Sequence, residues 1–247
     1  MSLTLLQWNC MYSEDPRLIA AFIASVDPDI ICLQELTDGY HDGLGKSGEW
    51  IANRLGYDHH CAYGPMVLPD GTQSLMGDGI LSRLPMTQKN TTMLQEGVIT
   101  DGKVTRDARM YLDVTIDADG HQLRIGTTHL PFHPRFQTTP MKSQMIGRII
   151  GSIPAHGRYI MAGDLNTTPR TKAAKSLRQH GLKNGGPSLI EPTWTTKPFN
   201  IGPWSYESLQ YRLDYVLHKS GVRAISARIL STELSDHLPI LVKFDVR

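Results

Sequence analysis

Short apolar runs separated by polar stretches follow one another along this chain, and their spacing predicts both strands and helices. Residues 3–8 (LTLLQW) and 29–35 (DIICLQE) are apolar runs of strand length. Between them, PRLIAAFIASV carries apolar residues at helical spacing after Pro16, so the chain opens with a strand, a helix and a strand. GEWIANRLG predicts a second helix that ends at Gly56.

The middle of the chain favours strands. Three short runs with strand character lie at 58–63, 79–83 and 86–94. Two alternating runs in RMYLDVTIDADGHQLRIGTTHL are separated by Asp119-Gly120, a pair that accepts positive φ. We therefore expect a hairpin whose second strand ends at His129.

Helices return in the last part of the chain. Residues 140–152 have a helical pattern, and 158–163 form an apolar run of strand length. PRTKAAKSLRQHG predicts a helix with Thr168 as N-cap, Pro169 at its first position and Gly181 at its end. Three further strands are expected near 212–217, 223–230 and 240–246.

These elements fit one architecture. Roughly ten strands and four helices, with a hairpin-rich middle, predict two packed sheets flanked by helices. No composition break, internal repeat or low-complexity tract marks a linker in the sequence, so we expect a single domain over residues 1–247.

Composition narrows the class of protein. The 25 basic and 24 acidic residues nearly cancel, so any site for a polyanion must be local. The three cysteines are odd in number and scattered among apolar residues, which is typical of reduced thiols. The longest apolar runs are strand-sized, and the N-terminal sequence lacks a signal peptide's features. We therefore expect a cytoplasmic protein that does not insert into a membrane, and a monomer.

Polar side chains stand where the predicted strands end. Asn9, Glu35, His129 and Asp164 each follow or end an apolar run, and Asn166 comes two positions after Asp164. Residues two apart in a strand face the same side, so Asp164 and Asn166 can converge. Each residue also has an ordinary structural interpretation: a turn residue, a surface carboxylate, a buried core histidine or an Asx-turn.

The set as a whole favours a metal site. Oxygen ligands such as Asn9, Glu35, Asp164 and Asp236 suit magnesium or manganese, whereas zinc is disfavoured because the cysteines lie apart. Asp236 and His237 must lie in a loop to reach one site, which Pro239 supports.

A second pairing is expected near the end of the chain. Asp214 lies within the apolar run YRLDYVL and requires a partner. His237 is the candidate, because a histidine oriented by a carboxylate is the usual arrangement for a general base.

These residues lie in segments that resemble the endonuclease/exonuclease/phosphatase superfamily, with the deoxyribonuclease I-like fold. The matching segments occur in family order over residues 4 to 240: LLQWN, PDIICLQE, GDGILSR, GTTHL, GDLN, RLDYVL and SDHLPI. The resemblance implies an α/β fold (α+β in some schemes), a four-layer α-β-β-α sandwich with two mixed, mostly antiparallel sheets. It also implies magnesium-dependent hydrolysis of a phosphate ester.

The resemblance also implies a role for each matching residue. Metal ligands would fall on Asn9 and Glu35, with Asp236 nearby, and Mn²⁺ is expected to replace Mg²⁺. The groups that act on the phosphate and the attacking water would be His129, Asp164, Asn166 and His237, with Asp214 orienting the histidine. Whether Asp164 or His237 is the general base stays open, as does the presence of one or two metals.

The substrate is the least determined part. His129 stands where abasic-site enzymes of this superfamily have a tyrosine, so the repair-nuclease interpretation is weakened. The acid-free segment 165–190 carries five basic residues, which fit either nucleic acid or a solvated helix face. We also name Arg109, His133 and Trp204 as substrate-binding candidates. The aromatic stretch that includes Trp204 fits either substrate contact or a small core under a loop.

The favoured function is hydrolysis of a phosphodiester, in DNA or RNA before other substrates. A phosphatase or phosphodiesterase acting on a small phosphorylated molecule or a lipid head group is an alternative. An inactive binding module on the same scaffold is the non-enzymatic alternative. A serine hydrolase built on Ser235 is disfavoured because the sequence has no Gly-x-Ser-x-Gly element.

Overall fold

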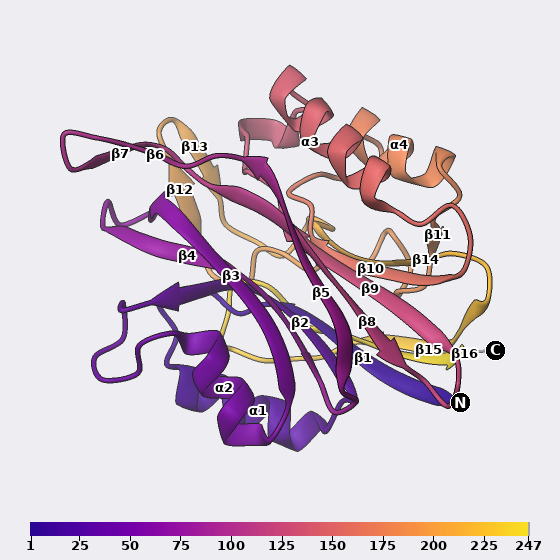
Figure 1. The fold of residues 1–247 in the computed structure, drawn as a ribbon. Helices are drawn as coiled ribbons and strands as arrows, with labels where there is room; N and C mark the ends of the chain where they lie inside the picture. The colour runs from indigo at the N-terminus through magenta and orange to yellow at the C-terminus, as the bar shows by residue number, and fades with distance from the viewer. Residues whose placement is uncertain (247) are drawn as a thin grey trace.

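The computed structural model describes residues 1–246, which form two six-stranded sheets between two pairs of helices (Figure 1). The first sheet has the order β15 (Val222–Ile229), β16 (Ile240–Val246), β1 (Ser2–Asn9), β2 (Ile30–Asp38), β4 (Gln73–Ser82) and β3 (Asp58–Val67). The second has the order β11 (Lys183–Asn184), β14 (Asp214–His218), β10 (Arg158–Asp164), β9 (Gln122–His129), β8 (Arg109–Asp117) and β5 (Met86–Gln95).

The helices form the outer layers. They are α1 (Pro16–Val26), α2 (Ser47–Leu55), α3 (Pro140–Ser152) and α4 (Lys172–Gln179), with a short 3₁₀ helix η1 (Pro134–Phe136). In Figure 1, α1 and α2 lie against the first sheet, while α3 and α4 lie on the opposite side, against the second. Only β1–β2 and β9–β10 run parallel among the paired strands of the two sheets in residues 1–246; the other pairs are antiparallel. The predicted four-layer sandwich with mixed, mostly antiparallel sheets is confirmed.

Alternation along the strands produces three apolar layers. In β1, Leu3 and Leu5 join the core between the sheets, whereas Leu6 and Trp8 pack toward α1 and α2. Tyr159 and Met161 of β10 face α3 and α4 in the same way, while Ile160 and Ala162 face the other sheet. Because both faces of each sheet are covered, these strands have apolar residues at nearly every position.

Local sequence signals set several element boundaries as expected. Helix α1 has proline at its start, α2 ends at Gly56 with φ of 75°, and α3 covers the predicted range. The β8–β9 hairpin has Asp119 at φ of 60° and Gly120 at φ of 75°, the positive angles that its turn requires.

One helix boundary was predicted wrongly. Thr168 does not cap α4; the helix begins at Lys172, and the Thr171 side chain accepts the hydrogen bond from the Ala174 N–H. Pro169 and Arg170 lie in the preceding turn, where the Thr171 N–H donates to the Thr168 carbonyl. The sequence offers three threonines before the helix, at positions 167, 168 and 171, and the turn that leaves β10 decides which one caps it.

The number and length of the strands were also underestimated. Residues 1–246 contain sixteen strands, four of which form two short ribbons: β6 (Val98–Thr100) with β7 (Lys103–Arg106), and β12 (Phe199–Ile201) with β13 (Trp204–Tyr206). Strand β4 begins at Gln73, six positions before the predicted start, because it pairs with β3 as far as Val67. None of the helices in residues 1–246 combines the length and hydropathy that a membrane-spanning segment requires.

Candidate active site

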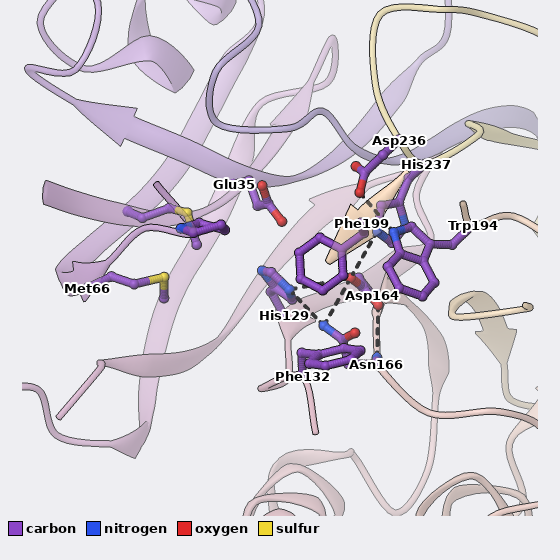
Figure 2. Close-up of a pocket in the computed structure, with 12 residues that line it drawn as sticks. Glu35, Met66, His129, Phe132, Asp164, Asn166, Trp194, Phe199, Asp236 and His237 are labelled. Atoms are coloured by element: carbon purple, nitrogen blue, oxygen red, sulfur yellow. Dashed lines mark hydrogen bonds and ion pairs between the residues drawn. The ribbon is translucent and has the colours of Figure 1, made fainter. Parts of the chain in front are cut away.

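A cavity of about 110 Å³ opens between the two sheets at the end where β1, β9 and β10 finish. Figure 2 shows its polar side chains gathered around Asp164, with aromatic rings beside them. The lining residues are Glu35, Met66, Pro69, Met76, His129, Phe132, Asp164, Asn166, Trp194, Phe199, Asp236 and His237. The polar members are the residues that the sequence nominated as candidates.

Strand register brings three of the predicted residues side by side. In the second sheet, Asp164 at the end of β10 pairs with His129 of β9 on one side and with Asp214 of β14 on the other. Gly163 permits this close pairing, because a Cβ at that position would lie 2.3 Å from the Thr128 carbonyl oxygen. Asp214 begins β14 and does not lie inside the strand as expected.

Asp164 is the central acceptor of the site. Its Oδ1 accepts a hydrogen bond from the Asn166 backbone N–H (2.8 Å). Its Oδ2 accepts from the side-chain amides of Asn9 (3.2 Å) and Asn166 (3.3 Å). Burial raises the pKa of Asp164 to about 7, although the neighbouring His237 opposes the rise. A carboxyl with a pKa near neutrality is suited to exchange protons with a substrate or water.

The Asp164–Asn166 pair is built by a turn, not by a continued strand. Asn166 has a φ of 43°, and its N–H bonds back to Asp164, so the two side chains converge through an Asx-turn. The two side chains were correctly expected to lie close together. The reason is the turn, however, and not the alternation of side chains along a strand.

His237 is oriented by Asp214 as predicted. Its Nδ1 lies 2.8 Å from Asp214 Oδ2, its Nε2 lies 3.7 Å from Asp164 Oδ2, and both residues are buried. Burial favours the neutral imidazole, but the surrounding carboxylates, Asp214 first, outweigh it and raise the pKa of His237 well above its ordinary value. The geometry therefore holds a protonated imidazole between two carboxylates, with Nε2 directed toward the cavity side.

His129 has the opposite electrostatic setting. Its Nε2 lies 3.0 Å from the Asn166 side-chain nitrogen and 3.3 Å from Asp164 Oδ2. Burial, together with the charge of Arg109, lowers the pKa of His129 well below its ordinary value. The pKa values of the two histidines are thus shifted in opposite directions, because His237 is surrounded by carboxylates, Asp214 first, whereas His129 is buried beside the positive charge of Arg109.

Glu35 does not end β2, contrary to expectation. The strand continues to Asp38, and its pairing with β4 shifts register between Gln34 and Leu36, so Glu35 occupies a bulge with φ of 62°. A bulge redirects one side chain without ending the strand. The Glu35 carboxylate accepts hydrogen bonds from the Asn9 side chain (2.9 Å) and the Tyr12 N–H (3.1 Å), which fix it at the cavity.

The donor set around Glu35 fits a hard divalent cation. Burial and, next, the charge of Asp236 raise the pKa of Glu35, because two carboxylates face one cavity. Neither lysine nor arginine is among the lining residues that could neutralise them. A cation bound by carboxylate and amide oxygens relieves this repulsion, so the residues predicted as metal ligands have suitable chemistry.

A tighter acidic cluster lies beside it. Potential ligand atoms of Asp164, Asp214 and His237 lie within 4.8 Å of one another. Since Asp214 and His237 are already at hydrogen-bonding distance, this cluster is better explained as a proton-holding pair beside Asp164 than as the first metal position.

The three predicted substrate-binding residues do not line the cavity. Arg109 is mostly buried behind His129, in a small void that it shares with Asp78. His133 is half-buried, with Nε2 3.3 Å from the Thr139 hydroxyl. Trp204 lies on β13, and its ring packs 4.6 Å from the Arg135 guanidinium carbon.

Several functional neighbours were missed from the sequence. Phe132, Met66 and Met76 form apolar walls of the cavity, and Lys142 is fully buried with its Nζ donating to the Asn166 carbonyl (2.7 Å). The sequence could not identify these wall residues, because they come from a loop and a hairpin that are far apart in the chain. Lys142 had a signal: it precedes Met145, Ile146 and Ile149 on the apolar stripe of α3.

The basic segment after the site lies on the outside. Arg170, Lys172, Lys175 and Lys183 are exposed, and α4 forms part of the outer helical layer in Figure 1. The aromatic stretch forms the small core that was expected as one of its alternatives: Trp194 and Phe199 pack in an aromatic cluster with Tyr206 and Phe136, and both also line the cavity.

Comparison with known proteins identifies the family. The family model for endonuclease/exonuclease/phosphatase proteins matches residues 6–237. The chain belongs to this family. Members of the family are hydrolases that act on phosphoester bonds. The sequence matches no curated protein.

Solved structures share the fold at low sequence identity. An endonuclease/exonuclease/phosphatase from Beutenbergia cavernae has 20% identity and a TM-score of 0.78, with coverage of 99% of this chain and 72% of that one. The human Nocturnin catalytic domain with bound sulfate has 20% identity and a TM-score of 0.72, covering 100% and 94%. D. rerio TDP2 with a single-strand DNA product has 17% identity and a TM-score of 0.72, covering 99% of each chain.

Proposed function

We propose that this protein hydrolyses phosphodiesters of nucleic acid by attack of water, with bound Mg²⁺ and with Mn²⁺ as a substitute. The observation that carries the proposal is the convergence of Glu35, Asp164 and Asp236 with two histidines on one cavity. Separate strands and a loop, far apart in the sequence, supply these groups. The family membership supports the same class of reaction.

Glu35, Asn9 and Asp236 are the residues proposed to hold the metal. The cation would neutralise negative charge that develops on the phosphate oxygens. Asn9 links the two parts of the site, since its side-chain amide donates to both Glu35 and Asp164. That link fixes the position of the proposed metal relative to the proposed base.

Asp164 is the proposed general base. Its pKa of about 7 places it between charged and neutral forms at physiological pH, and the Asn166 amides hold the carboxylate in one orientation. His237, protonated through its pairing with Asp214, would donate a hydrogen bond to a phosphate oxygen from Nε2. His129 and Asn166 would donate to the remaining oxygens.

Nucleic acid is the proposed substrate on two grounds. The TDP2 structure of the same fold contains a single-strand DNA product, and the Nocturnin structure contains a sulfate anion. In this chain, the exposed basic residues of the segment 165–190 follow directly on the strand that carries Asp164. A single domain of 247 residues and a cytoplasmic location, consistent with three free cysteines, are part of the proposal.

A hydrolysis panel tests the proposal. Plasmid DNA, RNA, a tyrosyl-linked oligonucleotide, sphingomyelin and inositol phosphates would be incubated with the protein in Mg²⁺, in Mn²⁺ and in EDTA. We expect metal-dependent cleavage of a nucleic acid and loss of at least about a hundredfold in the Asp164→Asn variant, as for removal of a general base. Undiminished cleavage by that variant would refute the assignment, and an inactive wild type would favour the binding-module alternative.

A further inference from the structure

We propose that the apolar half of the cavity selects phosphodiesters with a planar ring beside the scissile phosphate, either a nucleobase or an aromatic leaving group. This inference rests on the proposed function and specifies its substrate. It assigns a specificity-determining role to Met66, Phe199 and their neighbours.

The cavity is divided between charge and apolar surface. Half of its twelve lining residues are the polar groups of the proposed reaction centre. The other half are apolar: Met66, Pro69, Met76, Phe132, Trp194 and Phe199. A phosphate at the polar half therefore places one of its substituents against the apolar half.

The aromatic side of the cavity is shaped by ring packing. The centroids of Phe132 and Phe199 lie 5.4 Å apart, and those of Trp194 and Phe199 lie 5.5 Å apart, in edge-on arrangements. Trp194 is also held by the hydrogen bond from its Nε1 to Asp236 Oδ2 (2.8 Å). This bond ties the aromatic side directly to the proposed metal ligands, so a ring that packs here lies close to the phosphate.

Methionines form the opposite side. Met66 lies one residue before the end of β3, Met76 lies on the neighbouring β4, and both are 4% exposed. Figure 2 shows Met66 on the side of the cavity away from Phe199 and Trp194. Thioethers make favourable contacts with aromatic edges and adapt to irregular shapes, which suits a site for a flat ring.

Charge excludes more polar substrates. Glu35, Asp164 and Asp236 face the cavity, and no lysine or arginine lines it. Even with one divalent cation bound and His237 charged, the three carboxylates leave no excess positive charge in the cavity, so a singly charged diester is accepted more readily than a ligand with several phosphates.

Steady-state kinetics on three diesters that all release 4-nitrophenolate test the inference. The thymidine 5′-ester offers a nucleobase, the deoxyribose 5-ester lacks that base, and the methyl ester has the nitrophenyl ring alone. Phe199→Ala and Met66→Ala are the test variants, and Ile201→Ala is the matched control, because Ile201 lies on the same strand as Phe199 but is 43% exposed. Phe199→Leu keeps the apolar volume and removes the planar ring, in case Phe199→Ala fails to fold.

The pattern of effects identifies the source of the ring. If the cavity holds a nucleobase, wild-type kcat/KM for the thymidine ester exceeds that for the deoxyribose ester by about tenfold, and the test variants abolish the difference. If it holds the leaving group, the test variants lower kcat/KM by about tenfold for all three esters. Ile201→Ala leaves every value unchanged in both cases.

Two results overturn the inference in distinguishable ways. Test variants that stay within about twofold of wild type on every ester refute the ring site while leaving phosphodiester hydrolysis intact. A wild type that hydrolyses none of the esters in Mg²⁺ or Mn²⁺ refutes the proposed function, and the ring site with it.

Discussion

The pairing of Asp214 with His237 permits a quantitative prediction about catalysis. The two side chains lie 2.8 Å apart and are 0% and 4% exposed, so the carboxylate holds the imidazole in its charged form. Asp214→Asn keeps an acceptor for Nδ1–H and removes the negative charge. The substitution therefore tests the charge of His237 separately from its orientation.

The magnitude follows from Coulomb's law. Opposite charges about 4 Å apart at an effective dielectric constant of about 20 attract by about 4 kcal/mol. Removing that attraction lowers the pKa of His237, because less free energy then holds the proton on the imidazole. The variant's imidazole therefore loses its proton at a lower pH than the wild type's, because Asp214 is the largest of the causes that raise the pKa of His237.

The assay is kcat/KM against pH between 5 and 9 on one diester. If protonated His237 donates to the phosphate, wild-type activity rises with pH as Asp164 loses its proton near pH 7, then falls as His237 loses its own. In Asp214→Asn the alkaline limb moves to lower pH, and activity on the alkaline side falls about a hundredfold or more. Asp245→Asn is the control, since that carboxylate pairs with Arg223 near the surface.

An unchanged alkaline limb in Asp214→Asn would refute the donor role of His237. A shift of the acidic limb to lower pH, with activity at pH 6 retained or increased, would instead identify neutral His237 as the general base. The same experiment therefore decides the choice between Asp164 and His237 that the sequence left open.

Three further predictions concern metal binding, positioning and stability. Glu35→Gln should weaken Mn²⁺ binding, measured by calorimetry, by about tenfold or more, because a carboxylate ligand is lost. The control Glu233→Gln, at an exposed position, should bind Mn²⁺ as the wild type does. Equal Mn²⁺ affinities of Glu35→Gln and the wild type would show that Glu35 is not a metal ligand. Lys142→Met leaves the buried Asn166 carbonyl without its hydrogen-bond donor. The substitution should lower the free energy of unfolding by about 1–3 kcal/mol and reduce kcat. A urea unfolding curve that matches the wild type would contradict this prediction. Burial raises the pKa of the Asp78 carboxyl to about 8, which is above its value in the unfolded chain. The stability that the protonated Asp78 contributes is therefore present at pH 4 and is lost as pH rises through 8. The free energy of unfolding falls over this range with a slope of up to about 1.4 kcal/mol per pH unit. Asp78→Asn should flatten the fall in unfolding free energy between pH 5 and 8, and an unchanged slope would show that Asp78 does not titrate there.

The sequence by itself determined the elements whose signals are local. Pro16 and Gly56 mark helix ends, Asp119-Gly120 marks a hairpin, and uninterrupted apolar runs mark strands buried on both faces. It also determined which residues are chemically suited to the site, because an amide, a carboxylate or an imidazole at the end of an apolar run is visible without any coordinates.

Tertiary structure decided how these residues are aimed. Asp164 stands between His129 and Asp214 through strand register, and Glu35 turns toward the cavity through a bulge that no sequence pattern announces. The apolar walls were equally hidden, since Met66 and Phe132 belong to segments that meet only when the sheets pack. A residue's chemistry is a property of its own side chain, whereas its direction and neighbours depend on long-range pairing, which is why the sequence named the reactive groups and only the fold showed the pocket that they share.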